Sequence, residues 1–315
     1  MSAHWQEQRE GGSRLSWRLA FGAALRCGRT FMRGCIYPVT LYYFLRRGPE
    51  RRASRKYLAR LFGRPATTWQ VLKHLHCFGV TLADRIYLLA HGERDFDIEV
   101  KGVELLQQCI AQGRGVLLVG SHQGSFEVLR TLSTRCPDVP LRVLLDKQKT
   151  PAMTELLEAL APEVGEAVID VSQGGAAITL AVAETCRAGG MVALLADRGR
   201  AHEVLRRVDF LGQPAPFPVG PWLLANTLQV PVILCFGVYR GGRRYALNFE
   251  LFAERVEIPR DARNRALDDV LRRYAQRLEH YARLEPYNWF NFYDFWQQDN
   301  GQPVALTPAN TVPET

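Results

Sequence analysis

Short apolar runs alternate with amphipathic stretches along the middle of the chain, between residues 98 and 250. Uninterrupted apolar runs bounded by Gly, Pro or charged residues are typical of buried strands, and apolar residues at three- and four-residue steps are typical of helices. The predicted strands are residues 116–121, 140–147, 166–171, 191–197, 230–240 and 244–252. The predicted helices are residues 125–135, 154–162 and 176–189. This alternation indicates an α/β fold with a mixed, largely parallel central sheet flanked by helices.

The carboxyl-terminal part begins with the clearest helical pattern in the chain, at residues 266–286. Apolar residues recur there at helical steps and would form one buried face. They are Leu267, Val270, Leu271, Tyr274, Leu278 and Tyr281. Residues 289–296, WFNFYDFW, hold six aromatic side chains in eight positions, which fits either a core cluster or a lipid–water boundary. Residues 298–315 are polar and contain prolines, so we expect a flexible tail.

The amino-terminal residues 15–45 are apolar overall but are interrupted by arginines. These are Arg18, Arg26, Arg29 and Arg33. The longest uncharged run, residues 34–45, is too short to span a bilayer as a helix. No small-residue cleavage site follows a clean apolar core, which argues against a secretory signal. On a helical wheel most of these arginines lie on one side, which is the pattern of a helix lying in a membrane interface.

Residues 46–60, RRGPERRASRKYLAR, contain seven Lys or Arg and a single Glu. A basic cluster beside an apolar segment is attracted to an anionic leaflet, by about 1 kcal/mol for each charge near the surface. We therefore expect residues 1–60 to form a membrane-associating helical segment, residues 61–297 the main domain and residues 298–315 the tail. The alternative is a helix packed in the core, followed by a basic loop in solvent.

Composition and charge narrow the classes of function. The chain has 315 residues, of which 47% are hydrophobic and 23% charged, enough for one large domain or two closely packed ones. The formal charge of +8 favours an acidic partner, either nucleic acid, anionic lipid or an acidic protein. Nucleic acid is not expected, because no recognition motif for it is present. Seven scattered cysteines form no C-x-x-C pair, so we expect a reducing, cytoplasmic environment and neither a disulfide framework nor a zinc site.

The stretch GSHQGSFE, residues 120–127, carries the candidate chemistry. It lies where a predicted strand passes into a predicted helix, and ligands of α/β folds gather at the carboxyl ends of strands. A hydrogen bond between His122 and Glu127 would fix the tautomer of the imidazole and stabilise its protonated form. Such a pair, without a nucleophilic serine in a G-x-S-x-G turn, suits a general base that acts directly on a substrate hydroxyl. A purely structural contact between the two side chains is the alternative.

Two blocks of the sequence resemble a known family. SHQGSFE matches the H-x4-[D/E] motif of the lysophospholipid acyltransferase superfamily, in the His…Glu form of the lipid A late acyltransferases. Downstream, VALLADRGR at residues 192–200 and the proline- and glycine-rich stretch at residues 208–233 are similar to further segments of that family, in the same order and spacing. The flanks HWQEQREGGS and PYNWFNFYDFW resemble a subgroup associated with aryl-polyene or flexirubin-type pigment lipids.

The resemblance implies an O-acyltransferase that moves a fatty acyl chain from a thioester to a hydroxyl of a lipid or glycolipid. In that reaction His122 would be the general base, and Glu127 would orient it and stabilise its charge. Backbone N–H groups around Gly124 and Ser125, or a nearby arginine, would bind the oxyanion. The other residues expected at the substrate site are Lys147, Asp197, Arg198, Gly212, Pro214, Pro218 and Gly220. No metal and no cofactor are implied.

Several of these residues have a structural alternative. Asp197 and Arg198 end a predicted strand and should share a sheet edge with His122, but they could form only a structural ion pair. Lys147 also follows a strand, where charged residues are most often simply solvated. The block from Phe210 to Pro221 could be a rigid loop that enters a helix at Pro221.

The resemblance and the charge favour acyl carrier protein, which is strongly acidic, as the acyl donor, with acyl-CoA as the alternative. A basic rim would attract it, formed by residues such as Arg46, Arg47, Arg51, Arg52 and Arg55. The acceptor stays open between lipid A or another saccharide lipid, a lysophospholipid and a pigment lipid. The implied location is the cytoplasmic face of a bacterial inner membrane. The competing class is a membrane-associated lipid-binding protein of the same fold without catalytic activity.

Overall fold

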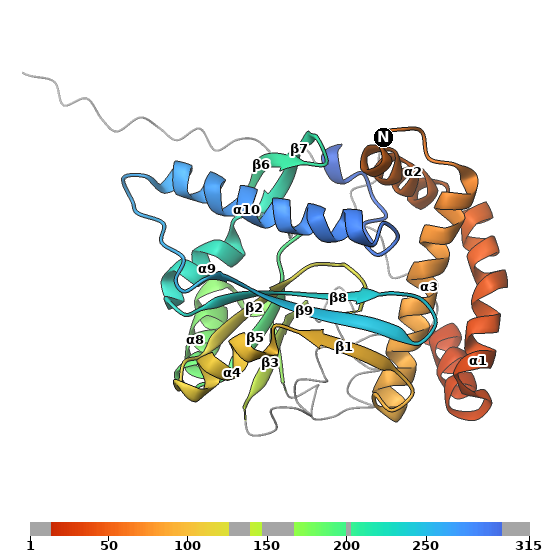
Figure 1. Ribbon diagram of the computed structural model, residues 1–315, viewed down its shortest axis with the longest axis horizontal. Coiled ribbons are helices and arrows are strands. Elements are labelled where there is room, and N and C mark those ends of the chain that lie inside the picture. Colours follow the sequence, from red (N-terminus) through yellow and green to blue (C-terminus); the bar gives the residue numbers. More distant parts are fainter. Residues whose placement is uncertain (1–13, 126–138, 147–166, 200–202, 298–315) are drawn as a thin grey trace, which may run out of the picture.

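A seven-stranded sheet forms the centre of the molecule, in a computed structural model that describes residues 14–125, 139–146, 167–199 and 203–297. The strand order is β1-β9-β8-β2-β5-β3-β4 (Figure 1), and all neighbours are parallel except the antiparallel pair β8 and β9. The strands are β1 Asp97–Lys101, β2 Val116–Gly120, β3 Leu141–Leu145, β4 Val168–Asp170, β5 Met191–Leu195, β8 Val232–Tyr239 and β9 Arg244–Ala253. The mixed, largely parallel α/β fold predicted from the sequence is therefore confirmed.

Helices pack on both faces of this sheet (Figure 1). The helices of the described residues are α1 Arg14–Arg46, α2 Gly48–Phe62, α3 Thr68–His91, α4 Val103–Ala111, α8 Gly175–Arg187, α9 Gly220–Leu228 and α10 Arg263–Leu284, with short 3-10 turns η3 Val171–Gln173 and η4 Phe295–Gln297. Helices α8, α9 and α10 contribute to the core on one face, and α4 contributes on the other. The predicted helices at 125–135 and 154–162 lie outside the described residues, apart from Ser125.

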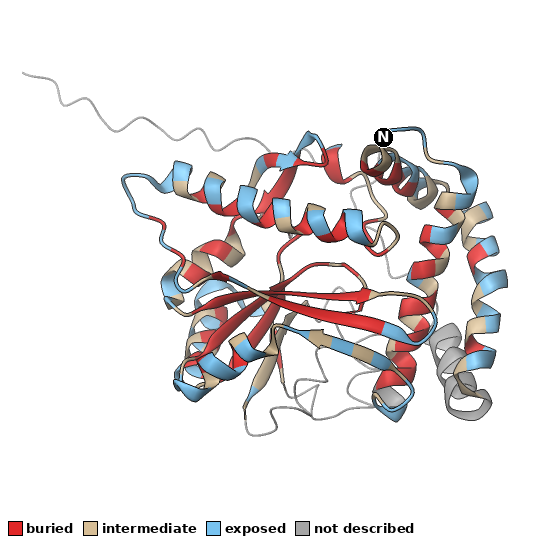
Figure 2. Ribbon diagram, viewed as in Figure 1, coloured by how far each residue is buried: buried red, intermediate tan, exposed pale blue. Residues whose placement is uncertain are grey.

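Strand β2 lies in the middle of the sheet, and this position explains its uninterrupted apolar sequence. Residues 116–119 are completely buried (Figure 2). Leu117 and Val119 belong to the core on the α10 face, whereas Val116 and Leu118 belong to the core on the α4 face. Successive side chains of a strand point to opposite faces, so a strand covered on both faces must be apolar at every position. The residues that follow β2 are consequently held at a rigid sheet edge.

Helix α10 covers the sheet with the face predicted from its sequence. All six apolar residues of the predicted pattern are buried. The hydroxyl of Tyr274 donates a hydrogen bond of 2.8 Å to the carbonyl of Gly120, the last residue of β2. Helix α10 therefore also fixes the point at which the chain leaves the central strand.

The proline-rich block folds differently from the rigid loop considered above. It forms a two-stranded antiparallel sheet of β6 Leu205–Phe210 and β7 Gln213–Pro218, followed by α9, whose first turn contains Pro221. Pro214, Pro216 and Pro218 occupy every second position of β7. Val219 directly follows Pro218, and its N–H donates to Val204 O at 3.1 Å. The prolines therefore occupy positions that need no donor toward β6, which is where a strand tolerates proline. Neither β6 and β7 nor β1 was predicted as strands.

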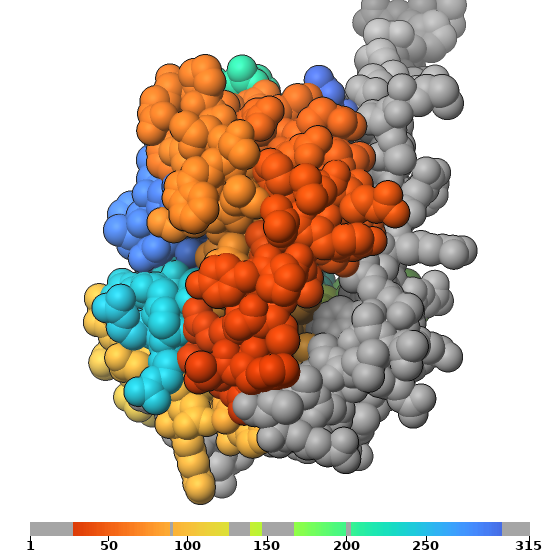
Figure 3. Space-filling view, turned by 90° about the vertical axis from the view of Figure 1, so that its right-hand side faces the viewer, coloured from red at the N-terminus to blue at the C-terminus, as the bar shows by residue number. Residues whose placement is uncertain are grey.

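The amino-terminal helices pack on α3 beside the sheet (Figure 3). Residues 46–60 are not a basic loop, because most of them form α2, which adds Tyr57, Leu58 and Leu61 to the main core. Within the part of the chain that the structure describes, no helix is long and apolar enough to cross a bilayer. The division at residue 60 and the membrane-associating role of residues 1–60 stay predictions.

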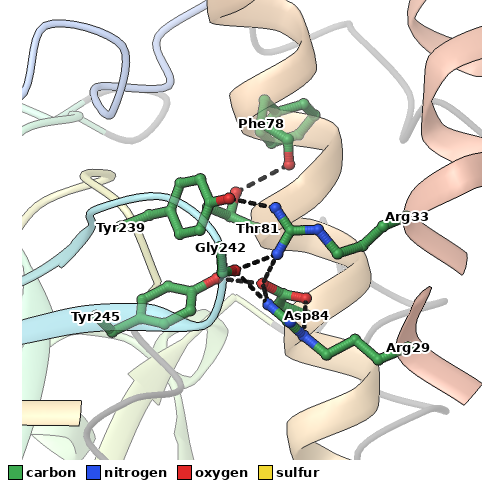
Figure 4. Close-up of polar contacts among 8 residues, drawn as sticks. All are labelled: Arg29, Arg33, Phe78, Thr81, Asp84, Tyr239, Gly242 and Tyr245. Carbon is green, nitrogen blue, oxygen red and sulfur yellow. Dashed lines mark hydrogen bonds and ion pairs between the residues drawn. The ribbon is translucent and has the colours of Figure 1, made fainter. Parts of the chain in front are cut away.

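A cluster of charged and polar groups joins α1, α3 and the β8–β9 hairpin (Figure 4). Asp84 of α3 is buried and accepts hydrogen bonds from Arg29 Nε at 2.8 Å and Nη2 at 2.7 Å, and from the Tyr245 hydroxyl at 2.9 Å. Arg33 lies 3.5 Å from the same carboxylate and also donates to the Tyr239 hydroxyl and to the carbonyl of Gly242. Arg29 and Arg33 thus point into the protein, whereas the helical wheel suggested a polar side facing lipid headgroups.

Replacing Asp84 with alanine is expected to lower the free energy of unfolding by about 3 kcal/mol, because it leaves two partly buried cations without their counter-charge. Urea unfolding followed by circular dichroism measures this. The matched control is Asp269→Ala, which removes an exposed ion pair with Arg272 and should cost less than about 0.5 kcal/mol. Equal losses in the two variants would mean that the cluster does not hold α1 in place.

Candidate active site

His122 and Asp197 meet at the carboxyl edge of the sheet. Strands β2 and β5 are parallel neighbours, with Gly120 opposite Leu195. His122 lies two residues beyond Gly120, and Asp197 lies two residues beyond Leu195. The shared register therefore brings both side chains to the same point, although 75 residues separate them in the sequence.

The carboxylate of Asp197 holds the imidazole at one nitrogen. His122 Nδ1 lies 2.7 Å from Asp197 Oδ1, and the backbone N–H of His122 donates to Oδ2 at 3.1 Å. The side chain of Asp197 is fully buried. Burial alone would raise the pKa of Asp197, but the imidazole of His122 and the guanidinium of Arg198 hold it below its usual range. An ionised Asp197 accepts the Nδ1 proton, so the tautomer is fixed and Nε2 becomes the acceptor.

Two residues of the carboxyl-terminal aromatic stretch complete the setting of this carboxylate. Trp289 Nε1 and Asn291 Nδ2 both donate to Asp197 Oδ2, at 3.0 and 3.1 Å. Arg198 is tied to the same stretch through Asn291 Oδ1 and the carbonyl of Phe290. A buried carboxylate with several donors is rigid, because each alternative orientation would leave buried polar groups unpaired.

The surroundings of the His122 ring disfavour its protonated form, and the ring is partly exposed. Burial, followed by the positive charge of Arg198, lowers the pKa of His122 below its usual value, and Asp197 offsets this only in part. About a third of the side chain, 32%, is exposed. Among the described residues, no hydrogen-bond partner occupies Nε2. The site therefore presents a neutral imidazole nitrogen that can accept a proton from a bound hydroxyl.

Gly124 and Ser125 shape the turn that carries His122. The N–H of Gly124 donates to Asn288 O and the N–H of Ser125 donates to Gly237 O, both at 2.8 Å. These two amides are engaged in backbone hydrogen bonds, so in this conformation they are not free to bind an oxyanion, contrary to the expectation from the sequence. Arg198, whose positive charge acts on His122, is one arginine near the site that could supply such a donor.

Gly124 has a steric reason to be glycine. Its φ is +63°, and a Cβ at this position would lie 1.9 Å from the carbonyl oxygen of Gly237. We expect Gly124→Ala to lower the free energy of unfolding by more than about 3 kcal/mol, since strain of a left-handed backbone adds to a backbone clash. Gly212, with φ +77° and no atom within 4 Å of the position that a Cβ would take, is the matched control and should lose only about 1 kcal/mol on the same change. Thermal unfolding of both variants measures this, and similar losses would show that the close approach to Gly237 is unimportant.

The remaining predicted residues are spread over the molecule. Gly212 lies in the β6–β7 turn, Pro214 and Pro218 lie in β7, and Gly220 begins α9. Within the described ranges, no hydrogen bond or ion pair joins any of these four to His122, and their role in lining the site stays a prediction. The hairpin reaches the site indirectly, because the Phe210 ring packs 5.1 Å from Trp289, whose indole holds Asp197. Glu127 and Lys147 lie outside the described residues.

A comparison with protein families adds a match that covers most of the chain. The family described as bacterial lipid A biosynthesis acyltransferase matches residues 18–298. The chain belongs to this family. The family resemblance seen in the sequence is therefore confirmed, and an O-acyltransferase of lipid biosynthesis is the activity class that membership implies. In a search of curated proteins, no individual protein matched.

Sequence reasoning missed two residues of this lipid A acyltransferase family member. Trp289 and Asn291 were seen only as parts of an aromatic stretch, yet both bind the carboxylate beside His122. The signal present in the sequence was the pair of asparagines among the aromatics, Asn288 and Asn291, both of which are buried. A buried asparagine needs specific partners, so it marks a place where polar groups are organised inside a core.

Proposed function

We propose that this acyltransferase moves a fatty acyl chain from the thioester of acyl carrier protein to a hydroxyl of a lipid or glycolipid, with His122 as the general base. The contact between His122 Nδ1 and Asp197 Oδ1 is the observation that supports this most, because it leaves Nε2 as the acceptor at an accessible position. The activity class of the family implies a lipid acceptor, and an acceptor of the lipid A type is the first to test.

The proposed reaction is a direct attack. His122 Nε2 takes the proton of the acceptor hydroxyl as its oxygen bonds to the thioester carbonyl carbon, which gives a tetrahedral oxyanion. Collapse of this intermediate breaks the carbon–sulfur bond, and the leaving thiolate takes the proton from Nε2. Asp197 stabilises the imidazolium between these two steps. Arg198 is the proposed source of positive charge near the oxyanion, and Glu127 stays a proposed second carboxylate of the site.

The donor proposal rests on charge. Five cationic side chains line a groove of about 670 Å³ along α2 and the loop after it. They are Arg52, Arg55, Lys56, Arg60 and Arg64. Two of them, Arg52 and Arg55, belong to the predicted basic rim, and both are exposed. A cationic surface favours an acidic partner such as acyl carrier protein. The proposed location is the cytoplasmic face of the inner membrane.

The test is acyl transfer with defined substrates. Purified protein is incubated with acyl-acyl carrier protein or acyl-CoA, and with an under-acylated lipid A, a lysophospholipid or a pigment lipid core as acceptor. Thiol release is followed in solution, and the acceptor is analysed by mass spectrometry for one added acyl chain. We expect faster transfer from the carrier protein than from CoA at equal concentration. No thiol release with any pair of substrates would favour the catalytically silent lipid-binding protein instead.

A further inference from the structure

The outward side of α1 is uncharged between Phe31 and Leu45, within the part of the helix whose side chains the structure describes. Between Phe31 and Leu45, every exposed residue lacks a charge. These residues, called here the outer face of α1, are Phe31, Gly34, Cys35, Tyr37, Pro38, Val39, Leu41, Tyr42 and Leu45. Phe31 is 53% exposed, Tyr37 67% and Leu45 65%. Figure 3 looks onto this side of the molecule, where the red-orange α1 lies at the surface.

Arg33 of this segment, and Arg29 just before it, point the other way. Arg29 and Arg33 reach inward to Asp84, and Arg33 also reaches Tyr239 and Gly242 of the β8–β9 hairpin (Figure 4). These contacts fix the rotation of α1 about its own axis. A helix at the surface of a soluble protein normally has the opposite arrangement, with charges outside and apolar residues inside. The apolar side of α1 is therefore held outward by the fold.

A contiguous exposed apolar face marks a surface that another body covers. Cations flank this face at its carboxyl end, where Arg46 is exposed and Arg47 is 43% exposed in its side chain. Apolar residues beside cations suit an anionic bilayer. The apolar residues enter its acyl region, and the cations bind its anionic headgroups. A second copy of the chain fits less well, because each copy carries a charge of +8.

We propose that the outer face of α1 is a membrane-docking surface, with α1 lying in the interface of an anionic leaflet. The proposal refines the membrane location given under the proposed function, and it reverses the orientation expected from the sequence, since apolar side chains rather than Arg29 and Arg33 enter the lipid. Helix α3 lies between α1 and the strand ends that carry the catalytic residues (Figure 1). With α1 in the lipid interface, α3 would separate the site from the lipid.

Flotation with vesicles tests this surface without any acyl transfer. The full chain and the variant Leu41→Ser/Tyr42→Ser/Leu45→Ser are mixed with vesicles of phosphatidylethanolamine and phosphatidylglycerol. The matched control is Leu180→Ser/Val204→Ser/Leu284→Ser, which changes three exposed apolar residues on other elements. We expect the partition constant to fall at least about tenfold in the outer-face variant, because membrane binding grows with the apolar area that enters the lipid interface. In the control it should stay within about twofold.

Three outcomes would overturn the proposal. They are unchanged flotation of the outer-face variant, equal losses in both triple variants, and a dimer of the native chain that only the outer-face variant dissociates in size-exclusion chromatography with light scattering. His122→Ala is included because it should float like the native chain, so failure of the catalytic proposal and failure of membrane docking give different results.

Discussion

Replacing His122 with alanine is expected to slow acyl transfer by about 10³-fold, the scale of a lost general base. In the proposed mechanism the acceptor hydroxyl loses its proton as it attacks the thioester, and Nε2 is the nitrogen that the Asp197 contact leaves as acceptor. Without the imidazole this proton must pass to water or to a carboxylate, both of which are much weaker bases than imidazole. Thiol release from acyl-acyl carrier protein, measured with the acceptor at saturation, reports the loss in kcat.

The matched control is His280→Ala, which removes an exposed imidazole on α10 and should leave kcat within about twofold. Circular dichroism and thermal unfolding serve to check that both variants are folded. A folded His122→Ala protein that keeps the native rate would remove the centre of the proposed mechanism, and the arrangement around Asp197 would then be structural.

Replacing Asp197 with asparagine is expected to slow acyl transfer by about 10²-fold and to change its pH dependence. An amide at this position cannot stabilise the imidazolium, and it can turn its NH₂ toward Nδ1, which favours the wrong tautomer. The base must be neutral, so the rate rises as pH increases through the pKa of His122, which lies below its usual value. Asp197 raises the pKa of His122, so its loss moves the acidic limb of the profile to lower pH.

Profiles of kcat against pH for the native chain and the variant test both parts. Asn291→Ala is the control, because it removes one donor to Asp197 but leaves the carboxylate, and its acidic limb should stay close to that of the native chain. Glu127→Gln separates the two carboxylates. If Glu127→Gln abolishes transfer while Asp197→Asn keeps both the native rate and the native profile, Glu127 alone partners the imidazole during catalysis.

The central strands could be predicted because burial on both faces requires apolar residues at every position. β2 and β5 are almost wholly buried, and both are uninterrupted apolar runs. β6 and β7 carry no such signal, since they form a small separate sheet with exposed positions and prolines. β1 lies at the edge of the main sheet and shows only an alternating pattern over five residues. Strand pattern is clear in the middle of a sheet and weak at its margins.

The site was predicted in part for a similar reason. His122 and Asp197 could each be placed at a strand end from local sequence, and their position on one sheet edge followed from the α/β pattern. Their contact depends on β2 and β5 being neighbours in register, which the sequence does not reveal for two residues 75 positions apart. The donors Trp289 and Asn291 come from a segment with no regular period at all. Local patterns indicate elements, whereas long-range pairing decides which side chains touch.

The origin of those donors has a consequence for biosynthesis. The groups that fix Asp197 stand at positions 289 and 291, close to the last described residue, 297. A ribosome releases the chain from its amino end, so the proposed docking face of α1 is synthesised well before the carboxylate of Asp197 acquires its full set of partners. If both proposals hold, a polypeptide that ends ahead of this segment could reach lipid but would lack the donors that orient Asp197.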